Sequence, residues 1–174
     1  VVATALAQGA YLTLPYINAA EAEQCKARLS ADERDRACFV SVDLMDEAAV
    51  NAMVSSQSRL DALIHLVGGF AMGPTPEFSY NDWRKQLDLN LNTTFLLCKH
   101  SLKKMLAQNY GRIVTIGSGG AVNPTAQMAA YSASKAGVVA LTKAIAQETK
   151  GTGVTANVVL PSVIDTPANR AAMG

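Results

Sequence analysis

Tyr131 and Lys135 are the two side chains of this chain best suited, by type and spacing, to acid–base chemistry. Residues four positions apart lie on one face of a helix, so the phenol and the ammonium would project into the same space. A free phenol has a pKa of about 10, and a positive charge nearby favours its ionised form and lowers that pKa. Ser118, thirteen residues upstream, could hold the oxygen of a carbonyl or alcohol that exchanges its proton with Tyr131. The three side chains predict acid–base chemistry at a carbonyl group.

The alternative for Tyr131 and Lys135 is an ordinary surface pair, whose apolar stems lie on the helix while the polar ends reach water. Such pairs are common on helices, and spacing alone does not distinguish them from a catalytic pair. The catalytic interpretation therefore depends on the elements around the two side chains.

The size and composition of the chain are those of a globular domain. It has 174 residues, of which 49% are hydrophobic, and a net charge of +1. This length predicts one domain, and the near-zero charge gives no reason to expect nucleic acid or a membrane as partner. No apolar run reaches the roughly 18 residues that a membrane span needs, and no signal peptide is visible. The cysteines, Cys25, Cys38 and Cys98, are odd in number and form no CxxC pair, which favours reduced thiols that act as small hydrophobic residues, a cytoplasmic location and no metal site.

Apolar segments alternate with helical segments along the whole chain. Strands are expected at residues 11–16, 37–42, 62–67, 112–116 and 154–160. Helices are expected at residues 1–8, from Asn18 onward with Glu21 in capping-box position, and at 46–58, 79–107 and 126–149. Strands without polar alternation, separated by helices, predict an α/β fold with a doubly wound parallel sheet of Rossmann type.

Polar residues gather where these strands end. Asp43, Gly68, Ser118 and the segment 161–166 each follow a predicted strand. Ligands of such sheets bind beyond the carboxyl ends of the strands, so a single site is expected there.

The long helix predicted at residues 79–107 carries apolar residues at spacings of three and four, which predicts a buried stripe. The stripe consists of Leu87, Leu91, Phe95, Cys98, Leu102 and Met105.

With these features the chain resembles the short-chain dehydrogenase/reductase family over nearly all of its length, best at residues 87–92, 112–118, 131–135 and 157–166. The resemblance implies a catalytic tetrad of Asn90, Ser118, Tyr131 and Lys135. It implies hydride transfer between a nicotinamide and a carbonyl or alcohol carbon, with Tyr131 exchanging the proton. Ser118 would bond the substrate oxygen, Lys135 would lower the pKa of Tyr131 and bind the ribose, and Asn90 would anchor a water.

Two alternatives concern Asn90. It could instead be a helix residue bonded to a nearby backbone group, and Asn92 is a competing choice for the same role. Asn90 is preferred because it matches the position of the asparagine in the family.

The resemblance also implies an NAD(P) site. Tyr131 and Lys135 would face the cofactor, and Gly68 would allow its close approach. Pro161, Val163 and Thr166 would contact the cofactor from the last segment, with Val163 beside the nicotinamide and Thr166 on the carboxamide and phosphates.

Asp43 would contact the adenine amine of this cofactor, by the same resemblance. An N-cap of the helix predicted at 46–58 is the alternative role of its carboxylate.

The chain departs from the family in lacking a first strand with a Gly-rich turn, and in stopping soon after Thr166. We expect residues 1–174 to be one dinucleotide-binding domain without that strand and without the C-terminal helix and strand, taken from a protein of roughly 250 residues. The missing strand would lie between the strands predicted at 11–16 and 62–67, and the isolated chain would bind its cofactor poorly.

Two smaller departures concern His65 and the strand that ends at Tyr16. His65 stands where the family has an asparagine, and we expect a packed, hydrogen-bonded histidine. Tyr16 and Ile17, followed by Asn18, carry neither the acid typical of NAD nor the base typical of NADP, which leaves NAD(P) open and favours NADP slightly.

The substrate is expected between the loops 69–78 and 119–127 and the segment after Pro161. The side chains there carry few fixed charges: Phe70, Met72, Val122, Met128 and Val163. A neutral or apolar carbonyl compound is therefore expected, with dihydropteridine reductase and 3-oxoacyl-carrier-protein reductase activities as specific possibilities.

Two further expectations concern the role and the assembly of the protein. A non-catalytic protein that binds or senses a dinucleotide on the same fold is the alternative function. A homodimer or homotetramer is expected because small residues on the last helix would let helices approach closely, although they would equally suit packing within the chain. These are Ala133, Ala136, Gly137 and Ala140.

Overall fold

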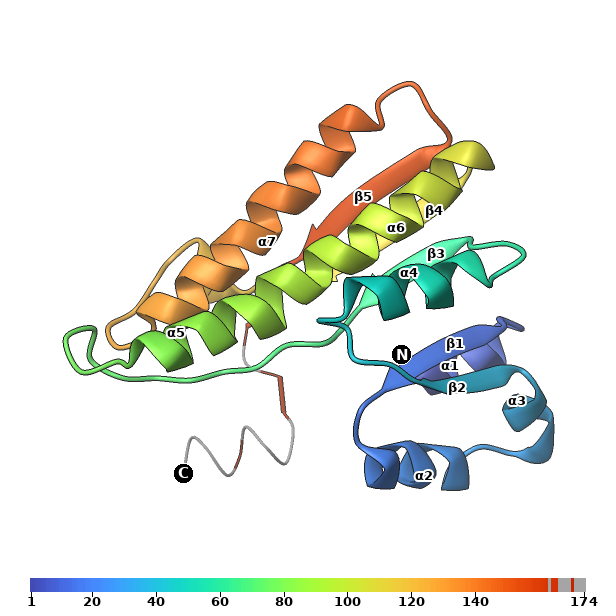
Figure 1. Ribbon diagram of the computed structural model, residues 1–174, viewed down its shortest axis with the longest axis horizontal. Helices are drawn as coiled ribbons and strands as arrows, with labels where there is room; N and C mark the ends of the chain where they lie inside the picture. The colour runs from blue at the N-terminus through green and yellow to red at the C-terminus, as the bar shows by residue number, and fades with distance from the viewer. Residues whose placement is uncertain (163, 166–169, 171–174) are drawn as a thin grey trace. The chain divides into compact units, whose positions relative to one another are not determined.

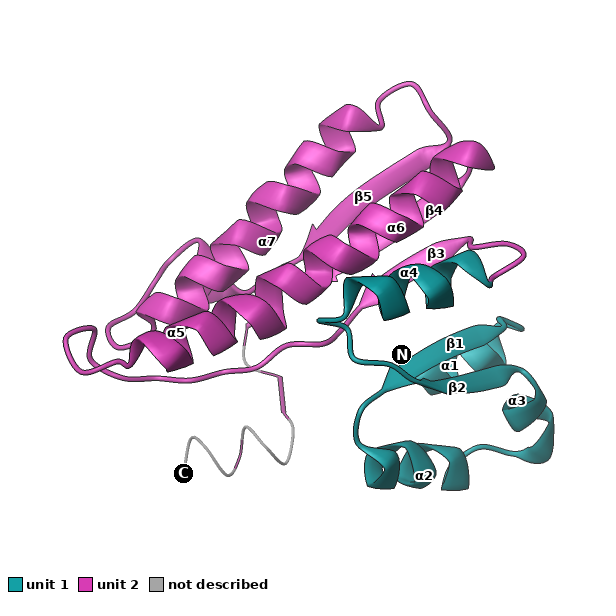
Figure 2. Cartoon of the chain, in the orientation of Figure 1, with its two compact units in different colours: residues 1–56 teal, residues 57–174 magenta. Residues whose placement is uncertain are grey.

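The computed structural model describes residues 1–162, 164–165 and 170. The chain divides into two compact units, Val1–Ser56 and Gln57–Gly174 (Figure 2). The expected single domain over 1–174 stays a prediction.

The first unit holds a parallel pair of strands with helices around it (Figure 1). Its elements are α1 (Val2–Ala7), β1 (Leu12–Tyr16), α2 (Ala19–Ala27), α3 (Ala31–Asp35), β2 (Ala37–Ser41) and α4 (Glu47–Ser55). The pairing runs from Leu12 opposite Ala37 to Tyr16 opposite Ser41. All elements predicted for this segment are present, and α3 is additional.

Helix starts in this unit follow from local side-chain caps. Asn18 Oδ1 accepts hydrogen bonds from the first turn of α2, as predicted. Asp46 does the same for α4. The additional helix α3 opens with a capping box between Ser30 and Glu33, a signal present in the sequence but obscured by the lack of apolar periodicity over five residues.

The second unit holds a parallel sheet in the order β3-β4-β5 (Figure 1). Its elements are β3 (Ala62–His65), α5 (Tyr80–Leu87), a π-helical turn (Asp88–Asn92), α6 (Thr93–Ala107), β4 (Gly111–Ile116), a 3₁₀ turn (Gly119–Ala121), α7 (Ala129–Glu148) and β5 (Val154–Val159). Helices α6 and α7 lie side by side on one face of this sheet and share one apolar core with it. That core consists of Cys98, Met105, Ile113, Ile145, Val154 and Ala156. The parallel strands flanked by helices confirm the predicted α/β architecture.

The helix predicted at 79–107 is continuous but changes register at the π-helical turn. Cys98 and Met105 are buried as predicted, whereas the prediction that Phe95 is buried is wrong, since it is 47% exposed. Phe95 follows the buried Thr94 by one residue, about 100° around the helix, so it lies outside the buried face of α6. A π turn holds more residues than an α turn, so the faces of α5 and α6 are out of phase. The buried residues nearest this turn are instead polar: Gln86, Asn90, Thr93 and Thr94.

Strand β3 ends at His65, two residues before the predicted end, and Leu66 and Val67 are exposed. It pairs with β4 from Ala62 to His65, and β1 belongs to the other sheet. A strand between β1 and β3 stays a prediction. Within the described residues, no helix is both long and apolar enough to cross a membrane.

Candidate functional site

Lys135 lies on the buried side of the first half of α7. Only 6% of its surface is exposed, and its Nζ donates a hydrogen bond to the carbonyl of Ile116 at the end of β4, at 2.9 Å. Burial lowers the pKa of Lys135, because a charged ammonium is less stable away from water. The surface-pair alternative is therefore wrong for Lys135.

Tyr131 lies one turn before Lys135 and is half-buried. Its ring meets the edge of the Phe70 ring, with 4.9 Å between the ring centroids and 79° between the planes. Phe70 is 50% exposed and comes from the loop after β3. This loop therefore reaches the first turn of α7 and forms an apolar wall beside the phenol.

Asn90 lies in the π-helical turn and is fully buried. Its Oδ1 accepts from the backbone N–H of Gly69 at 2.9 Å, and its Nδ2 donates to the carbonyl of Gly69 at 3.0 Å. A further hydrogen bond of 3.1 Å runs from Nδ2 to the hydroxyl of Ser134 on α7. The alternative of a backbone-bonded asparagine is thus correct as to contacts, while the anchoring of a water stays a prediction.

Asn92, the competing choice, lies on the outside of the same turn. It is exposed and its Nδ2 donates to Asp88 Oδ1 at 2.7 Å. Of the two asparagines, Asn90 is therefore the buried one, and its place in the catalytic tetrad stays a prediction.

Gly68 lies where Asn90 and Lys135 converge. A Cβ atom at this position would be 2.7 Å from Asn90 Oδ1 and 3.2 Å from Lys135 Nζ. Both distances are shorter than ordinary van der Waals contact, so a side chain at Gly68 would displace one of the two polar groups. Glycine is required here for space.

Ser118 follows β4 and caps the 3₁₀ turn, where its Oγ accepts from Gly120 N at 3.2 Å. A Cβ atom on Gly120 would be 3.6 Å from the hydroxyl oxygens of both Ser118 and Ser132, the neighbour of Tyr131. Ser118 therefore lies beside the first turn of α7. The carbonyl of Pro161 accepts a hydrogen bond from Gly119 N at 3.1 Å, so the segment after β5 also lies beside the turn that follows Ser118.

His65 is buried and hydrogen-bonded, as predicted, with its Nε2 3.2 Å from Thr93 Oγ1. The Thr93 hydroxyl donates its hydrogen to the carbonyl of Leu89, so we assign the Nε2 nitrogen of His65 as the donor. Among the described residues, Nδ1 has no hydrogen-bond partner. Burial, helped by the charge of Lys135, lowers the pKa of His65 to about 4.

For three residues predicted to bind the cofactor, that role stays a prediction. Asp43 belongs to the first unit, where its carboxylate accepts from Met45 N at 2.8 Å. The N-cap alternative for Asp43 is wrong, because Asp46 caps α4. Val163 and Thr166 lie outside the described residues.

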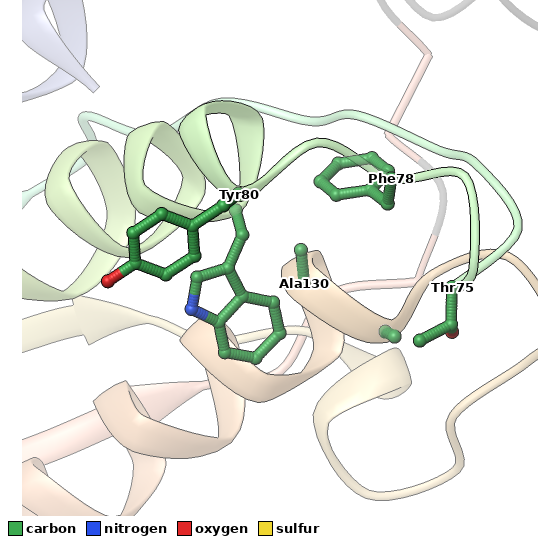
Figure 3. Close-up of a pocket in the computed structure, with 6 residues that line it drawn as sticks. Thr75, Phe78, Tyr80 and Ala130 are labelled. Carbon is green, nitrogen blue, oxygen red and sulfur yellow. The ribbon is translucent and has the colours of Figure 1, made fainter.

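A separate pocket of about 190 Å³ lies between the segment before α5, α5 itself and the start of α7 (Figure 3). Its lining is largely apolar and consists of Thr75, Phe78, Tyr80, Trp83, Ala129 and Ala130. None of the predicted catalytic residues is among them.

The second unit thus brings Asn90, Ser118, Tyr131, Lys135, Gly68 and Pro161 to one end of its sheet. Sequence reasoning missed Ser134, which joins Asn90 to α7. Its position three residues after Tyr131, from which a serine hydroxyl can bond back to a helix carbonyl, was the available signal.

Comparison with known proteins agrees with this geometry. The model of the family described as short chain dehydrogenase matches residues 1–173. D-threitol dehydrogenase of Mycolicibacterium smegmatis is 36% identical over 160 residues, which are 90% of this chain and 62% of that protein.

Two solved structures have the same fold. ElxO with NADP bound is 25% identical with a TM-score of 0.89, over 99% of this chain and 71% of that one. NAD⁺-bound xylitol dehydrogenase is 26% identical with a TM-score of 0.84, over 92% of this chain and 64% of that one. Because the family model matches nearly its whole length, the chain belongs to the short-chain dehydrogenase/reductase family.

Proposed function

We propose that the protein is an NAD(P)-dependent oxidoreductase that transfers a hydride between a nicotinamide and the carbonyl or alcohol carbon of a small neutral molecule. The observation that carries this proposal is the convergence of Asn90 and Lys135 on Gly68, with Asn90 hydrogen-bonded to the helix turn of Tyr131 through Ser134. A buried lysine with a lowered pKa, grouped with polar side chains beyond the strand ends, is typical of a catalytic site.

The donors at this site suit a nicotinamide nucleotide. Of the three N–H groups of Lys135, one donates to Ile116 within the described chain, which leaves two for ribose hydroxyls. Gly68, without a side chain, allows a ligand to approach the backbone, and Tyr131 and Pro161 border the same place. When bound, the cofactor supplies the hydride for reduction of a carbonyl or takes it up during oxidation of an alcohol.

The side chains of the protein donate and accept the proton that accompanies the hydride. In reduction, Tyr131 gives its phenolic proton to the substrate oxygen, and in oxidation it takes that proton back. Ser118 accepts from Gly120 N, so its own O–H can donate to the substrate oxygen and hold it against the phenol. The ammonium of Lys135 stabilises the phenolate that is left after proton transfer.

The substrate is a neutral carbonyl compound or alcohol in this proposal. Phe70, Met72 and Val122 are each at least half exposed and uncharged, so the loops around Tyr131 offer apolar surface and no counter-charge. The D-threitol and xylitol dehydrogenases act, by their names, on neutral polyols. Dihydropteridine and 3-oxoacyl-carrier-protein reduction remain specific alternatives within this class.

NADP is favoured slightly over NAD. Strand β1 ends at Tyr16, followed by Ile17 and Asn18, so no carboxylate repels a 2′-phosphate there. ElxO was solved with NADP and xylitol dehydrogenase with NAD⁺, so relatives use both.

A homodimer or homotetramer and a cytoplasmic location complete the proposal. Ala133, Ala136 and Ala140 form an exposed stripe of small residues on α7, and Phe95 of α6 is exposed as well. Gly137, in contrast, packs within the chain on Leu91. The three cysteines are free thiols, which suits a reducing compartment.

The deciding experiment is the intact mass of the purified protein, followed on the same sample by NADH and NADPH titration with nicotinamide fluorescence and by a carbonyl reduction assay. Binding with turnover supports the proposed enzyme. Binding without turnover on any carbonyl of a broad panel would instead support the dinucleotide-sensing alternative. A mass of 18.3 kDa without binding would mean that this chain alone does not form the cofactor site.

A further inference from the structure

Ser134 lies in a buried hydrogen-bond network that joins three segments of the second unit. Ser134 and Asn90 are both fully buried. The Ser134 hydroxyl donates to the carbonyl of Tyr131 at 2.7 Å and accepts from Asn90 Nδ2 at 3.1 Å. Through Asn90, the network continues to both polar groups of the Gly69 backbone.

Each donor hydrogen in this network has a single acceptor. The Ser134 hydroxyl has a single hydrogen, which points to the Tyr131 carbonyl, so it can only accept from Asn90. The two hydrogens of Asn90 Nδ2 go to Ser134 and to the Gly69 carbonyl, while Oδ1 faces the Gly69 N–H. The opposite orientation of the Asn90 amide would set N–H against N–H at Gly69, so the network fixes that amide in one state.

We infer that Ser134 is a positioning residue, which fixes the position of Tyr131 relative to Asn90 and to the loop that begins at Gly69. The inference rests on the proposed function, since it assigns Tyr131 the proton transfer. The π-helical turn and α7 are joined at other points by apolar packing, such as Leu91 on Gly137, which tolerates small shifts. A buried hydrogen bond does not tolerate them, because its strength falls steeply with distance and angle. A shift of this turn by a fraction of an ångström would move the phenol away from the substrate oxygen.

The network also affects Phe70, which borders the proposed substrate-binding surface beside Tyr131. Its ring rests on the Tyr131 ring, and its loop is held at Gly69 by Asn90 and at Gly73 by a 2.9 Å hydrogen bond from Gly73 N to the carbonyl of Gln127. Loss of the Ser134 hydroxyl would therefore loosen both the proton donor and the wall beside it.

The test compares Ser134→Ala and Ser134→Thr with the control Ser101→Ala. Ser101 lies on α6, is 1% exposed, and its Oγ has no hydrogen-bond partner in the described structure. Ser101→Ala therefore removes a buried hydroxyl, as Ser134→Ala does, but leaves the hydrogen-bond network unchanged. Steady-state kinetics over a range of pH, cofactor binding, thermal melting and amide hydrogen exchange at Gly69 are measured on all of them.

The expected result for Ser134→Ala is a loss in kcat of about ten-fold or more, because the proton donor is displaced, with cofactor affinity changed less than about two-fold. Its pH profile of kcat should shift, exchange at Gly69 should accelerate, and Ser134→Thr, which retains the hydroxyl, should recover most of the lost rate. Ser101→Ala should match the unmodified protein in all four measurements.

Two results would overturn the inference. One is a folded Ser134→Ala variant with unchanged kcat, pH profile and Gly69 exchange. The other is a loss of kcat that Ser101→Ala reproduces, which would assign the effect to general destabilisation. If the unmodified protein binds dinucleotide but reduces no carbonyl, the proposed function is wrong, whatever the Ser134 variants show. In that case the hydrogen-bond network is tested by amide exchange alone, and unchanged exchange at Gly69 in Ser134→Ala would refute it.

Discussion

The side-chain amide of Asn90 pairs with the backbone of Gly69 as a neighbouring strand would. Its Oδ1 accepts from Gly69 N at 2.9 Å and its Nδ2 donates to Gly69 O at 3.0 Å, although the two residues are 21 positions apart. Strand β3 has already ended at His65, so these backbone groups have no ladder partner. A helix side chain thus satisfies the polar groups of the chain where it leaves the sheet, at the point where the proposed site begins.

Tyr131→Phe removes the proposed proton donor and little else. We expect kcat for carbonyl reduction to fall by about 10² to 10⁴, since this is the range that general acid catalysis contributes. Cofactor affinity, followed by fluorescence titration, should stay within about two-fold because the ring remains. Tyr80→Phe is the matched control, since Tyr80 is 75% exposed and is not among the residues of the candidate site. A near-normal rate for Tyr131→Phe would remove Tyr131 from its proposed role.

Gly68→Ala should be far more harmful than Gly69→Ala. The new Cβ at residue 68 would meet Asn90 Oδ1 at 2.7 Å and Lys135 Nζ at 3.2 Å, both fixed by hydrogen bonds. At residue 69 it would meet the end of the Leu89 side chain, which is 39% exposed and can move. We expect Gly68→Ala to lower the free energy of unfolding by about 1–3 kcal/mol, and to reduce kcat about ten-fold. Urea unfolding and kinetics of the two variants check this, and equal effects would contradict it.

His65 should make the protein less stable in mild acid. Its pKa is about 4 when folded, against about 6.5 in an unfolded chain, so the unfolded state binds more protons between these values. The free energy of unfolding should therefore decrease by about 2 kcal/mol from about pH 7.5 to about pH 5 through His65 alone.

The variant His65→Gln isolates this contribution, because glutamine can still donate to Thr93 and does not titrate. Urea midpoints at the two pH values give the comparison. If His65→Gln shows the same loss of stability between them, another group is responsible.

Cys98 should resist alkylation in the folded protein. Burial raises the pKa of its thiol to about 12, and 1% of its surface is exposed. The thiolate is the reactive form, so iodoacetamide should modify the exposed Cys38 first and Cys98 only after unfolding. Mass spectrometry of digests from native and urea-treated samples checks this order, and early modification of Cys98 would show that the core around it opens.

Local signals in the sequence were sufficient for the helix starts and the strands. Asn18 caps the helix that it was expected to open, because a cap depends only on the residues beside it, whereas α4 is capped by Asp46 and not by the candidate Asp43. Ile113 and Ala156 are buried in the parallel strands β4 and β5 as expected, although burial alternates along both strands, with Arg112, Thr155 and Asn157 exposed.

Contacts between distant segments could not be read in the same way. Phe95 was expected in the core because the apolar spacing continued through it, but the buried face of α6 centres on Thr94, Cys98 and Met105, and Phe95 lies about 100° around the helix from Thr94. The bond between Asn90 and Ser134 joins residues 44 positions apart. The four candidate tetrad residues could still be named, because the resemblance to a family supplied the tertiary information that spacing lacks, and their catalytic roles stay predictions.

The π-helical turn at Asp88–Asn92 also has a consequence for how this helix is compared with others. Each residue of an α-helix advances the side-chain direction by about 100°, so the extra residue in the wide turn counts as an insertion within an unbroken helix. Deleting one residue there would preserve the helix and rotate everything before it, turning Trp83 and Gln86 to a different side while Cys98 stayed in place. An ungapped alignment from Tyr80 to Ala107 against a helix without this turn, if in phase over α6, would be out of phase over the 8 residues of α5.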